Sequence, residues 1–279
     1  MKASISQITT VTASFDDDVA AYRAAGATGL GIWELKLTDD DLATRSLADA
    51  GLTATHCVPV VPSVLPLPLM PDAPTEPEER VDALRASLRR LAAFEPACVL
   101  CLTGPAGERD PAEARRVVVE GLRALADDAA AAGVRLAVEP IQPEFRDLWS
   151  LVSGLDETVA LLHEVARAEL GIMFDTWHLW NTAGLTDGIA RERDRIAGVH
   201  VADWRDPTRN TNDRVMPGDG IAGLPRILDA LDRAGYDGWY DVEIFSDADL
   251  DGSLWRLAPD EAARRAVTGL NRVWQARAG

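Results

Sequence analysis

Residues 98–141 read CVLCLTGPAGERDPAEARRVVVEGLRALADDAAAAGVRLAVEPI and contain one complete strand–helix–strand unit. The two apolar ends, Cys98 to Thr103 and Arg135 to Ile141, are typical of buried strands. Between them, Asp110 to Ala132 spaces apolar residues three and four apart, which indicates a helix with one buried face. Asp110 and the proline after it suit a helix start, and Gly133 suits its end. The segment therefore predicts two parallel strands joined by a helix.

The same alternation continues on both sides of this unit. Eight short β-rich runs each precede a helical pattern, and they are Ala3 to Thr9, Gly29 to Leu37, Thr53 to Val60, Cys98 to Thr103, Arg135 to Ile141, Gly171 to Asp175, Ile196 to Ala202 and Gly238 to Phe245. Ala-Gly pairs at Gly26, Gly51 and Gly235 indicate that a glycine ends the preceding helix. Eight units in 279 residues, without a G-x-G-x-x-G after the first strand, predict an α/β fold: one (β/α)8 TIM barrel as a single domain over residues 1–279.

Composition narrows the partners and the compartment that we expect. The formal net charge of −17 disfavours nucleic acid, because binding phosphates requires clustered Lys and Arg. No apolar run approaches the roughly 18 residues of a membrane span, and Met1 to Thr10 lacks the pattern of a leader peptide, so we expect a cytoplasmic protein without membrane association. The expected partner is a small molecule, and formation of a homo-oligomer stays open.

The three cysteines do not suggest a disulfide framework. Cys98 and Cys101 form a C-x-x-C, but both lie in one predicted strand, where their odd separation points the side chains to opposite faces. We therefore expect reduced thiols at Cys57, Cys98 and Cys101 rather than a metal or redox pair.

Four consecutive predicted strands end in residue types that bind metals. The strand ends are Leu136-Ala-Val-Glu139, Ile172-Met-Phe-Asp175, Ala197-Gly-Val-His200 and Tyr240-Asp-Val-Glu243. Each of these ionisable groups alone is readily explained as an ordinary polar residue at a strand end. Four in succession, however, would be neighbours at the rim of a barrel. One shared cation would then compensate the burial of all four. Three carboxylates and one imidazole suit one divalent ion, Mn²⁺, Mg²⁺, Co²⁺ or Zn²⁺.

Several other polar residues lie near predicted strand ends. His178 follows Asp175 by three residues, and we expect it to bind substrate; His56 has a similar position with weaker support. Asp241 shares a strand face with Glu243, where it could orient a ligand or form an inward salt bridge. His163 falls in a helical pattern and is expected to be structural. Seven prolines between Pro59 and Pro77 predict either a rigid surface connection or a wall of the catalytic pocket.

These motifs resemble the xylose isomerase-like TIM barrel superfamily of sugar isomerases, epimerases and inosose-processing enzymes, and the resemblance covers essentially the whole chain. Its most specific parts are Val138-Glu-Pro140, Phe174-Asp-Thr-Trp-His178, Val199-His-Val-Ala-Asp203, Asp213-Arg-Val-Met-Pro-Gly-Asp-Gly220 and Asp241-Val-Glu-Ile-Phe245. The last two look most like 2-keto-myo-inositol isomerases. The resemblance implies that Glu139, Asp175, His200 and Glu243 bind the metal and that His178 and Arg214 face the substrate.

The expected reaction is isomerisation of a small polyhydroxylated ketone or sugar through an enediolate, with Glu139 and Glu243 as the candidate proton carriers. Ketose 3-epimerases of the superfamily usually carry an acid where this chain has Phe145 and an arginine where it has Asp206, which counts against that reaction. The alternatives are an inosose dehydratase that uses the same site, a related DNA-repair endonuclease, which needs more than the four histidines here, and a barrel that only binds a sugar.

Overall fold

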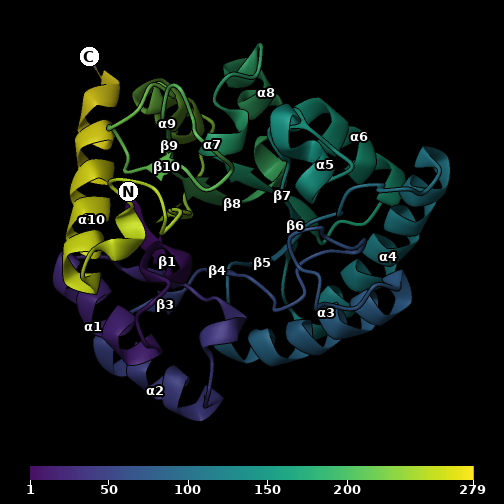
Figure 1. Ribbon diagram of the computed structural model, residues 1–279, viewed down its shortest axis with the longest axis horizontal. Coiled ribbons are helices and arrows are strands. Elements are labelled where there is room, and N and C mark those ends of the chain that lie inside the picture. The colour runs from purple at the N-terminus through teal and green to yellow at the C-terminus, as the bar shows by residue number, and fades with distance from the viewer. Residues whose placement is uncertain (279) are drawn as a thin grey trace.

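Parallel strands form the centre of the computed structural model, which describes residues 1–278 (Figure 1). The strands of the main sheet are β1 (Lys2–Ser6), β2 (Gly29–Gly31), β3 (Thr53–Ala54), β4 (His56–Cys57), β5 (Cys98–Cys101), β6 (Leu136–Val138), β7 (Leu170–Asp175), β8 (Ile196–Val201) and β11 (Trp239–Val242). Their order is β3-β2-β1-β11-β8-β7-β6-β5-β4, and every pairing is parallel. Only Thr55 separates β3 from β4, so these are two pieces of one strand, and the sheet closes into the predicted (β/α)8 barrel.

Helices form a ring around the strands (Figure 1). The eight that follow the barrel strands are α1 (Phe15–Ala25), α2 (Asp40–Ala50), α3 (Pro77–Leu91), α4 (Pro111–Ala132), α6 (Gly154–Val165), α8 (Leu185–Glu192), α9 (Leu224–Arg233) and α10 (Pro259–Gln275). Two short helices, α5 (Arg146–Trp149) and α7 (Thr176–Leu179), and the antiparallel pair β9 (Asp203–Trp204) and β10 (Arg214–Val215) lie in the connections. None of the helices in residues 1–278 is long and apolar enough to cross a membrane.

The predicted helix after β5 is confirmed together with both of its ends. Asp110 Oδ1 accepts the N–H groups of Ala112 and Glu113, which satisfies two donors that the first turn leaves free. Gly133 ends the helix with a φ of 72°, a conformation that costs glycine little. Gly26 and Gly51 end α1 and α2 in the same left-handed conformation.

Most barrel strands are shorter than the sequence pattern predicts, and the first two show the reason. The chain leaves the sheet after Ser6 and forms the 3-10 turn η1 (Gln7–Thr10), where Gln7 Nε2 and Thr10 Oγ1 donate to the carboxylate of Asp18 at 2.8 and 2.6 Å. After β2 it forms a second turn, η2 (Glu34–Lys36), whose Glu34 accepts the N–H of Val60 at 2.9 Å. Hydrogen bonds to side chains thus replace ladder hydrogen bonds at these strand ends.

Buried apolar side chains form two cores. The larger one lies between the barrel and its helices, and the smaller one, which includes Cys98 and Met173, lies inside the barrel. Cys101 belongs to the larger core, so the two cysteines of the C-x-x-C face opposite sides of β5 as predicted. Cys57, Cys98 and Cys101 are free thiols, and burial raises the pKa of Cys101 to about 12. A buried thiol with so high a pKa is a poor metal ligand.

The proline-rich segment after β4 packs against the barrel. Arg80 of α3 binds two carbonyl groups of this segment. Its Nε donates to the carbonyl of Ser63 at 3.0 Å, and its Nη1 donates to the carbonyl of Pro74 at 2.8 Å. Val64 and Leu65 are fully buried. Pro62 also lines a cavity that Glu139 and Glu243 line, so the structure supports the pocket-wall prediction for this segment.

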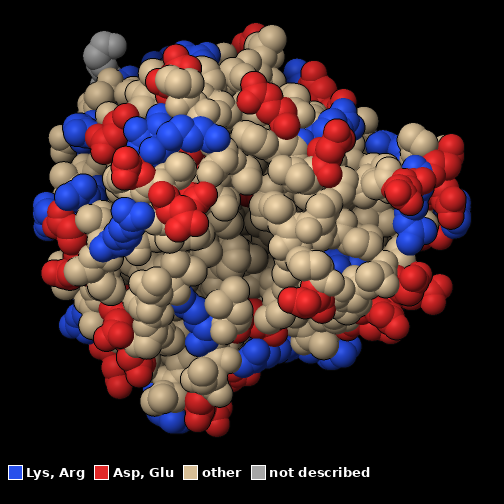
Figure 2. All heavy atoms as spheres, viewed as in Figure 1, with Lys and Arg blue, Asp and Glu red and all other residues tan. Residues whose placement is uncertain are grey.

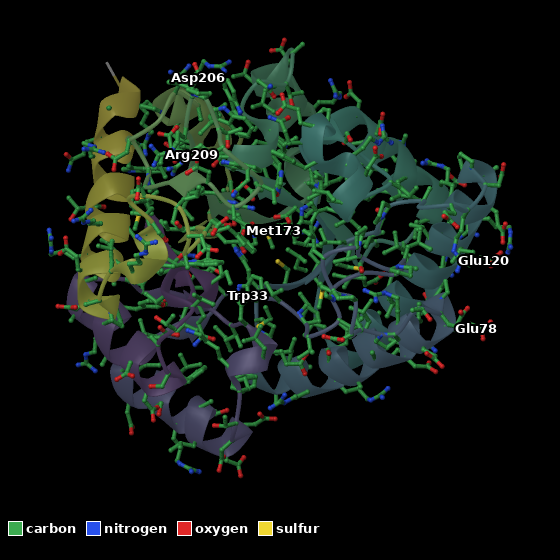
Figure 3. The ribbon with its side chains drawn as sticks, viewed as in Figure 1. Trp33, Glu78, Glu120, Met173, Asp206 and Arg209 are labelled. Carbon is green, nitrogen blue, oxygen red and sulfur yellow. The ribbon has the colours of Figure 1, made fainter. Side chains whose placement is uncertain are left out.

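Charge is distributed unevenly over the face seen in the figures. Figure 2 shows a hollow near the centre of the helix ring, bordered by uncharged residues, with acidic and basic side chains mostly farther out. Glu78 and Glu120, on α3 and α4, lie at the outer edge, whereas Trp33 and Met173 lie near the centre (Figure 3).

Candidate metal and substrate site

The structure brings the four predicted metal ligands together. Glu139 directly follows β6, Asp175 ends β7, His200 lies in β8 and Glu243 directly follows β11, and these strands are neighbours in the barrel. All four side chains are buried, and one donor atom of each lies within 4.8 Å of the donor atoms of the others. Ligands bound to one ion at about 2.0–2.2 Å lie within about 4.4 Å of one another, so small side-chain movements would complete a coordination sphere.

The chemistry of this donor set fits a divalent cation. Three carboxylates share a site from which water is largely excluded, and such like charges repel one another unless a positive group compensates them. His200 Nδ1 lies 3.0 Å from Glu139 Oε1 and 3.3 Å from Glu243 Oε2, so this ring nitrogen faces the carboxylates. A cation among these four residues would provide the missing positive charge.

The pKa values of the cluster reflect this crowding. Burial raises the pKa of Glu139 to about 7, and the charges of Asp175 and Glu243 act in the same direction. Burial acts against protonation of His200, but Glu243 and Glu139 nevertheless hold its pKa well above the usual range. Burial also acts to raise the pKa of Glu243, yet His200 and Arg214 keep that pKa below its ordinary value.

Arg214, which is predicted to bind substrate, lies beside the cluster. It begins β10, and its Nη1 donates to Asp175 Oδ2 at 2.8 Å and to Glu243 Oε2 at 3.1 Å. The guanidinium carbon lies 4.9 Å from the centre of the Trp177 ring and 4.7 Å from that of Phe245. The buried Nε has no hydrogen-bond partner among the described residues, so Arg214 keeps a free donor.

His178, on α7, has the surroundings of an imidazole that donates a hydrogen bond from Nε2. The N–H of Gln142 donates to His178 Nδ1 at 3.1 Å, and burial together with the nearby Arg214 lowers the pKa of this histidine well below its usual range. A neutral imidazole whose Nδ1 accepts a hydrogen bond carries its proton on Nε2. His178 Nε2 lies 3.4 Å from Arg214 Nη2 and 3.8 Å from Asp175 Oδ2, on the side of the metal cluster.

A cavity opens over these residues, and its empty space is about 480 Å³ when the open solvent at its mouth is counted with it. Glu139, His178, Arg214 and Glu243 contribute its polar groups, together with Thr211 and Asn212. Most of the remaining wall is apolar and includes Trp33, Trp149, Phe245, Leu100, Leu102 and Ile141. The sequence pattern did not identify these wall residues, although Trp33 and Phe245 both lie shortly after barrel strands.

His56 lies deeper than the cavity and is not among the described residues that line it. It is 1% exposed, and its ring packs beside that of His200, with 5.3 Å between the centroids. The predicted contact between His56 and substrate therefore gains no support from the cavity. His163, by contrast, lies in α6 as expected, with Nε2 2.8 Å from Arg195 Nη2.

The structure also places Phe145 and Asp206, the two residues that depart from the ketose 3-epimerase pattern. Phe145 stacks on Trp177, with 5.4 Å between ring centroids and 12° between planes, so a packing aromatic occupies the position of the acid. Asp206 lies in the loop between β9 and β10, exposed to solvent, and Figure 3 shows it well away from Trp33 and Met173 near the centre of the barrel.

Comparison with known proteins gives consistent matches over the chain. A family model described as Xylose isomerase-like TIM barrel matches residues 19–273. A 2-oxo-tetronate isomerase from Cupriavidus necator is 30% identical over 154 residues, 54% of this chain and 56% of that enzyme. An inosose dehydratase from Geobacillus thermodenitrificans is 25% identical over 47% of each chain. This chain thus spans about half the length of these two relatives. A Streptomyces coelicolor protein named "Putative hydroxypyruvate isomerase" is 29% identical over 88% of this chain and 91% of that protein.

Solved structures show the same architecture. Protein SMc04130 from Sinorhizobium meliloti is 27% identical, with a TM-score of 0.86 over 97% of this chain and 98% of that one. The IolI protein, crystallised with a bound zinc atom, is 18% identical, with a TM-score of 0.78 over 99% of both chains, which shows a shared fold.

Proposed function

The chain belongs to the xylose isomerase-like TIM barrel family, and on this basis we propose that it is a divalent-metal-dependent isomerase of a small polyhydroxylated ketone or sugar. The observation that carries the proposal is the meeting of three buried carboxylates and one histidine, of which Glu139 and Glu243 line the cavity. Relatives named as isomerases of small oxo acids and as an inosose dehydratase support substrates of this kind.

We propose that Glu139, Asp175, His200 and Glu243 hold the ion, which the donor set restricts to a type such as Mn²⁺, Mg²⁺, Co²⁺ or Zn²⁺. The zinc bound by IolI, a protein of the same fold, supports a metal centre here. When bound, the ion would supply a Lewis acid that stabilises negative charge on the substrate's carbonyl and neighbouring hydroxyl oxygens.

The proton carriers are Glu243 and Glu139, the two predicted ligands that also line the cavity. Glu243 would take a proton from the carbon next to the carbonyl, the C–H electron pair would form the double bond of the enediolate, and the carbonyl oxygen would take up the charge. The proton of the neighbouring hydroxyl would pass to the former carbonyl oxygen, and Glu139, protonated at the outset, would supply a proton to the former carbonyl carbon, which moves the carbonyl by one position without changing the mass. Proton exchange with solvent would then return Glu243 to its charged form and Glu139 to its protonated form. General acid–base catalysis of this kind contributes about 10²- to 10⁴-fold to the rate.

The other polar groups of the cavity would orient the substrate. His178 presents its Nε2–H as a donor, and Arg214 keeps the free Nε–H described above. Arg214 is the one Lys or Arg among the described residues that line the cavity, and Asp175 and Glu243 already neutralise it. Because phosphate binding usually requires several donors or cations, we propose an unphosphorylated substrate.

A dehydratase acting through the same carbanion is the second candidate, because one relative is an inosose dehydratase. The two reactions are separated by incubating the metal-loaded protein with a panel of inososes and ketoses in D₂O and following the products by NMR and mass spectrometry. An isomer that has gained deuterium supports isomerisation, whereas a product lighter by one water supports elimination. Absence of both exchange and product across the panel would contradict the proposed function.

A further inference from the structure

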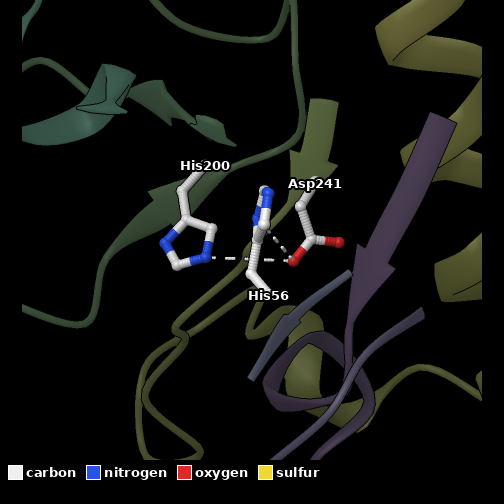
Figure 4. A group of neighbouring side chains, drawn as sticks. All are labelled: His56, His200 and Asp241. Carbon is white, nitrogen blue, oxygen red and sulfur yellow. Dashed lines mark ion pairs between the residues drawn. The ribbon is translucent and has the colours of Figure 1, made fainter. Parts of the chain in front are cut away.

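A second buried polar group lies beside the metal ligands, inside the barrel. It consists of His56 in β4, His200 in β8 and Asp241 in β11, which come from three different strands and point toward one another (Figure 4). Each is at most 1% exposed. Asp241 lies in β11 and is two residues before Glu243, so the two side chains project to the same side of the chain.

The polar atoms of this group are buried without hydrogen-bond partners among the described residues. They are both ring nitrogens of His56, both carboxylate oxygens of Asp241 and the Nε2 of His200. An unsatisfied buried polar atom destabilises the folded state, so five in one place require an explanation. Asp241 Oδ2 lies 3.9 Å from His200 Nε2 and 3.7 Å from His56 Nδ1, so a shift of about 1 Å would form a hydrogen bond.

Two glycines on surrounding strands make room for this group. A Cβ at Gly31 in β2 would collide with Asp241 Oδ2, and a Cβ at Gly198 in β8 would lie 2.8 Å from His56 Nε2. Any larger residue at either position would displace the polar side chains. The space for Asp241 and His56 is therefore a feature of the barrel wall.

The orientation of His200 connects this group to the proposed metal centre. Nδ1 of His200 faces Glu139 and Glu243, and Nε2 faces Asp241. A neutral imidazole has one nitrogen with a lone pair and one with a proton, and a metal ligand must present the lone pair to the ion. Nε2 must then carry the proton, and the carboxylate nearest to it, 3.9 Å away, is that of Asp241.

We propose that Asp241 is a positioning residue that accepts the Nε2–H of His200 and so turns the Nδ1 lone pair toward the metal, with His56 supporting the same carboxylate. Ligand histidines commonly donate their second N–H to a carboxylate, and losing that partner typically weakens metal affinity about 10- to 100-fold. The inference rests on the proposed metal centre but not on the identity of the substrate.

The first test is the Zn²⁺ affinity of Asp241→Asn, measured by competition with a chromophoric chelator. Asparagine keeps the shape of the side chain but loses its charge, so we expect affinity to fall about 10- to 100-fold. Asp18→Asn is the matched control, because Asp18 is also fully buried but contacts Gln7, Thr10 and Lys36 rather than His200. This control should bind Zn²⁺ as the wild type does. Equal affinity of folded Asp241→Asn and wild type would overturn the inference.

The second test uses the wild type and so does not depend on how well a variant folds. Nitrogen-15 NMR of the Zn²⁺-loaded, histidine-labelled protein should show His200 protonated at Nε2 and metal-bound at Nδ1. The reverse tautomer, or a second Zn²⁺ bound by His56, His200 and Asp241, would overturn the inference while leaving the proposed function intact. A wild type that binds no divalent ion would overturn the proposed function and this inference with it.

Discussion

Replacing Glu243 by glutamine separates the two roles proposed for this residue, metal ligand and proton carrier. Glutamine keeps a carbonyl oxygen that can approach the ion, but it cannot accept a proton from substrate. Arg214, which donates to Glu243 Oε2 at 3.1 Å, would keep its shorter 2.8 Å contact with Asp175, so its position should be maintained. We therefore expect Glu243→Gln to lose about 10²- to 10⁴-fold in kcat, or about 3 to 5 kcal/mol of transition-state stabilisation, with a smaller loss of metal affinity.

The assay compares turnover and solvent-deuterium exchange at the substrate carbon, both at saturating metal, with metal affinity measured separately. Exchange should fall in parallel with turnover, because both require removal of the same proton. Glu144→Gln is the matched control, since Glu144 is an exposed glutamate in the turn after β6 and should behave as the wild type. If the metal-loaded Glu243→Gln protein turns over at the wild-type rate, Glu243 is only a ligand, and Glu139 or His178 must carry the proton.

Four further predictions concern metal, substrate, nucleic acid and pH. Metal analysis should find about one divalent ion per chain, and the Asp175→Ala, His200→Ala double variant should lose it, because the four predicted ligands form one complete set. Arg214→Met should raise KM in steady-state kinetics, since methionine packs against Trp177 but provides no donor. Gel-shift assays at physiological salt should detect no binding of duplex DNA, with or without abasic sites, because the net charge is −17. Burial raises the pKa of Asp18 from 3.8 to about 6, so the folded state binds more protons than the unfolded state in this pH range. The unfolding free energy should therefore fall as pH rises from about 4 to 6. Asp18→Asn should flatten that slope in denaturant titrations.

The fold was predictable because its signals are local and repeated. Each strand and helix pair carries its own apolar period, and α4 shows in addition a capping aspartate, a first-turn proline and a terminal glycine. The ends of β1 and β2 were not predictable in the same way. Gln7 and Glu34 leave the ladder because distant partners, Asp18 and the N–H of Val60, offer them hydrogen bonds, and such pairings are absent from any local pattern.

The candidate metal ligands were predictable for a related reason: parallel strands in a barrel bring their carboxyl ends to one rim, so order along the chain becomes adjacency in space. The residues that line the cavity could not be predicted in this way. Trp149 and Thr211 reach it from separate connections, and Trp149 Nε1 lies 3.3 Å from Thr211 Oγ1 although 62 residues separate them. Contacts of this kind depend on how the loops fold over the rim.

His56 and His178 show why closeness to a strand end does not by itself identify a substrate-binding residue. Both histidines lie near the ends of predicted strands, yet His178 lines the cavity, whereas His56 contacts His200 and Asp241 from β4 inside the barrel. Barrel strands are tilted by about 36° to the axis, so residues at equal distances from their strand ends lie at different depths. The depth of His56 follows from the register of the closed sheet, in which His56 pairs with Cys98, and from the glycine at position 198 that leaves space for its ring. At that depth His56 contacts His200 and Asp241 but does not line the cavity. Replacing His56 should therefore change metal affinity more than it changes substrate affinity.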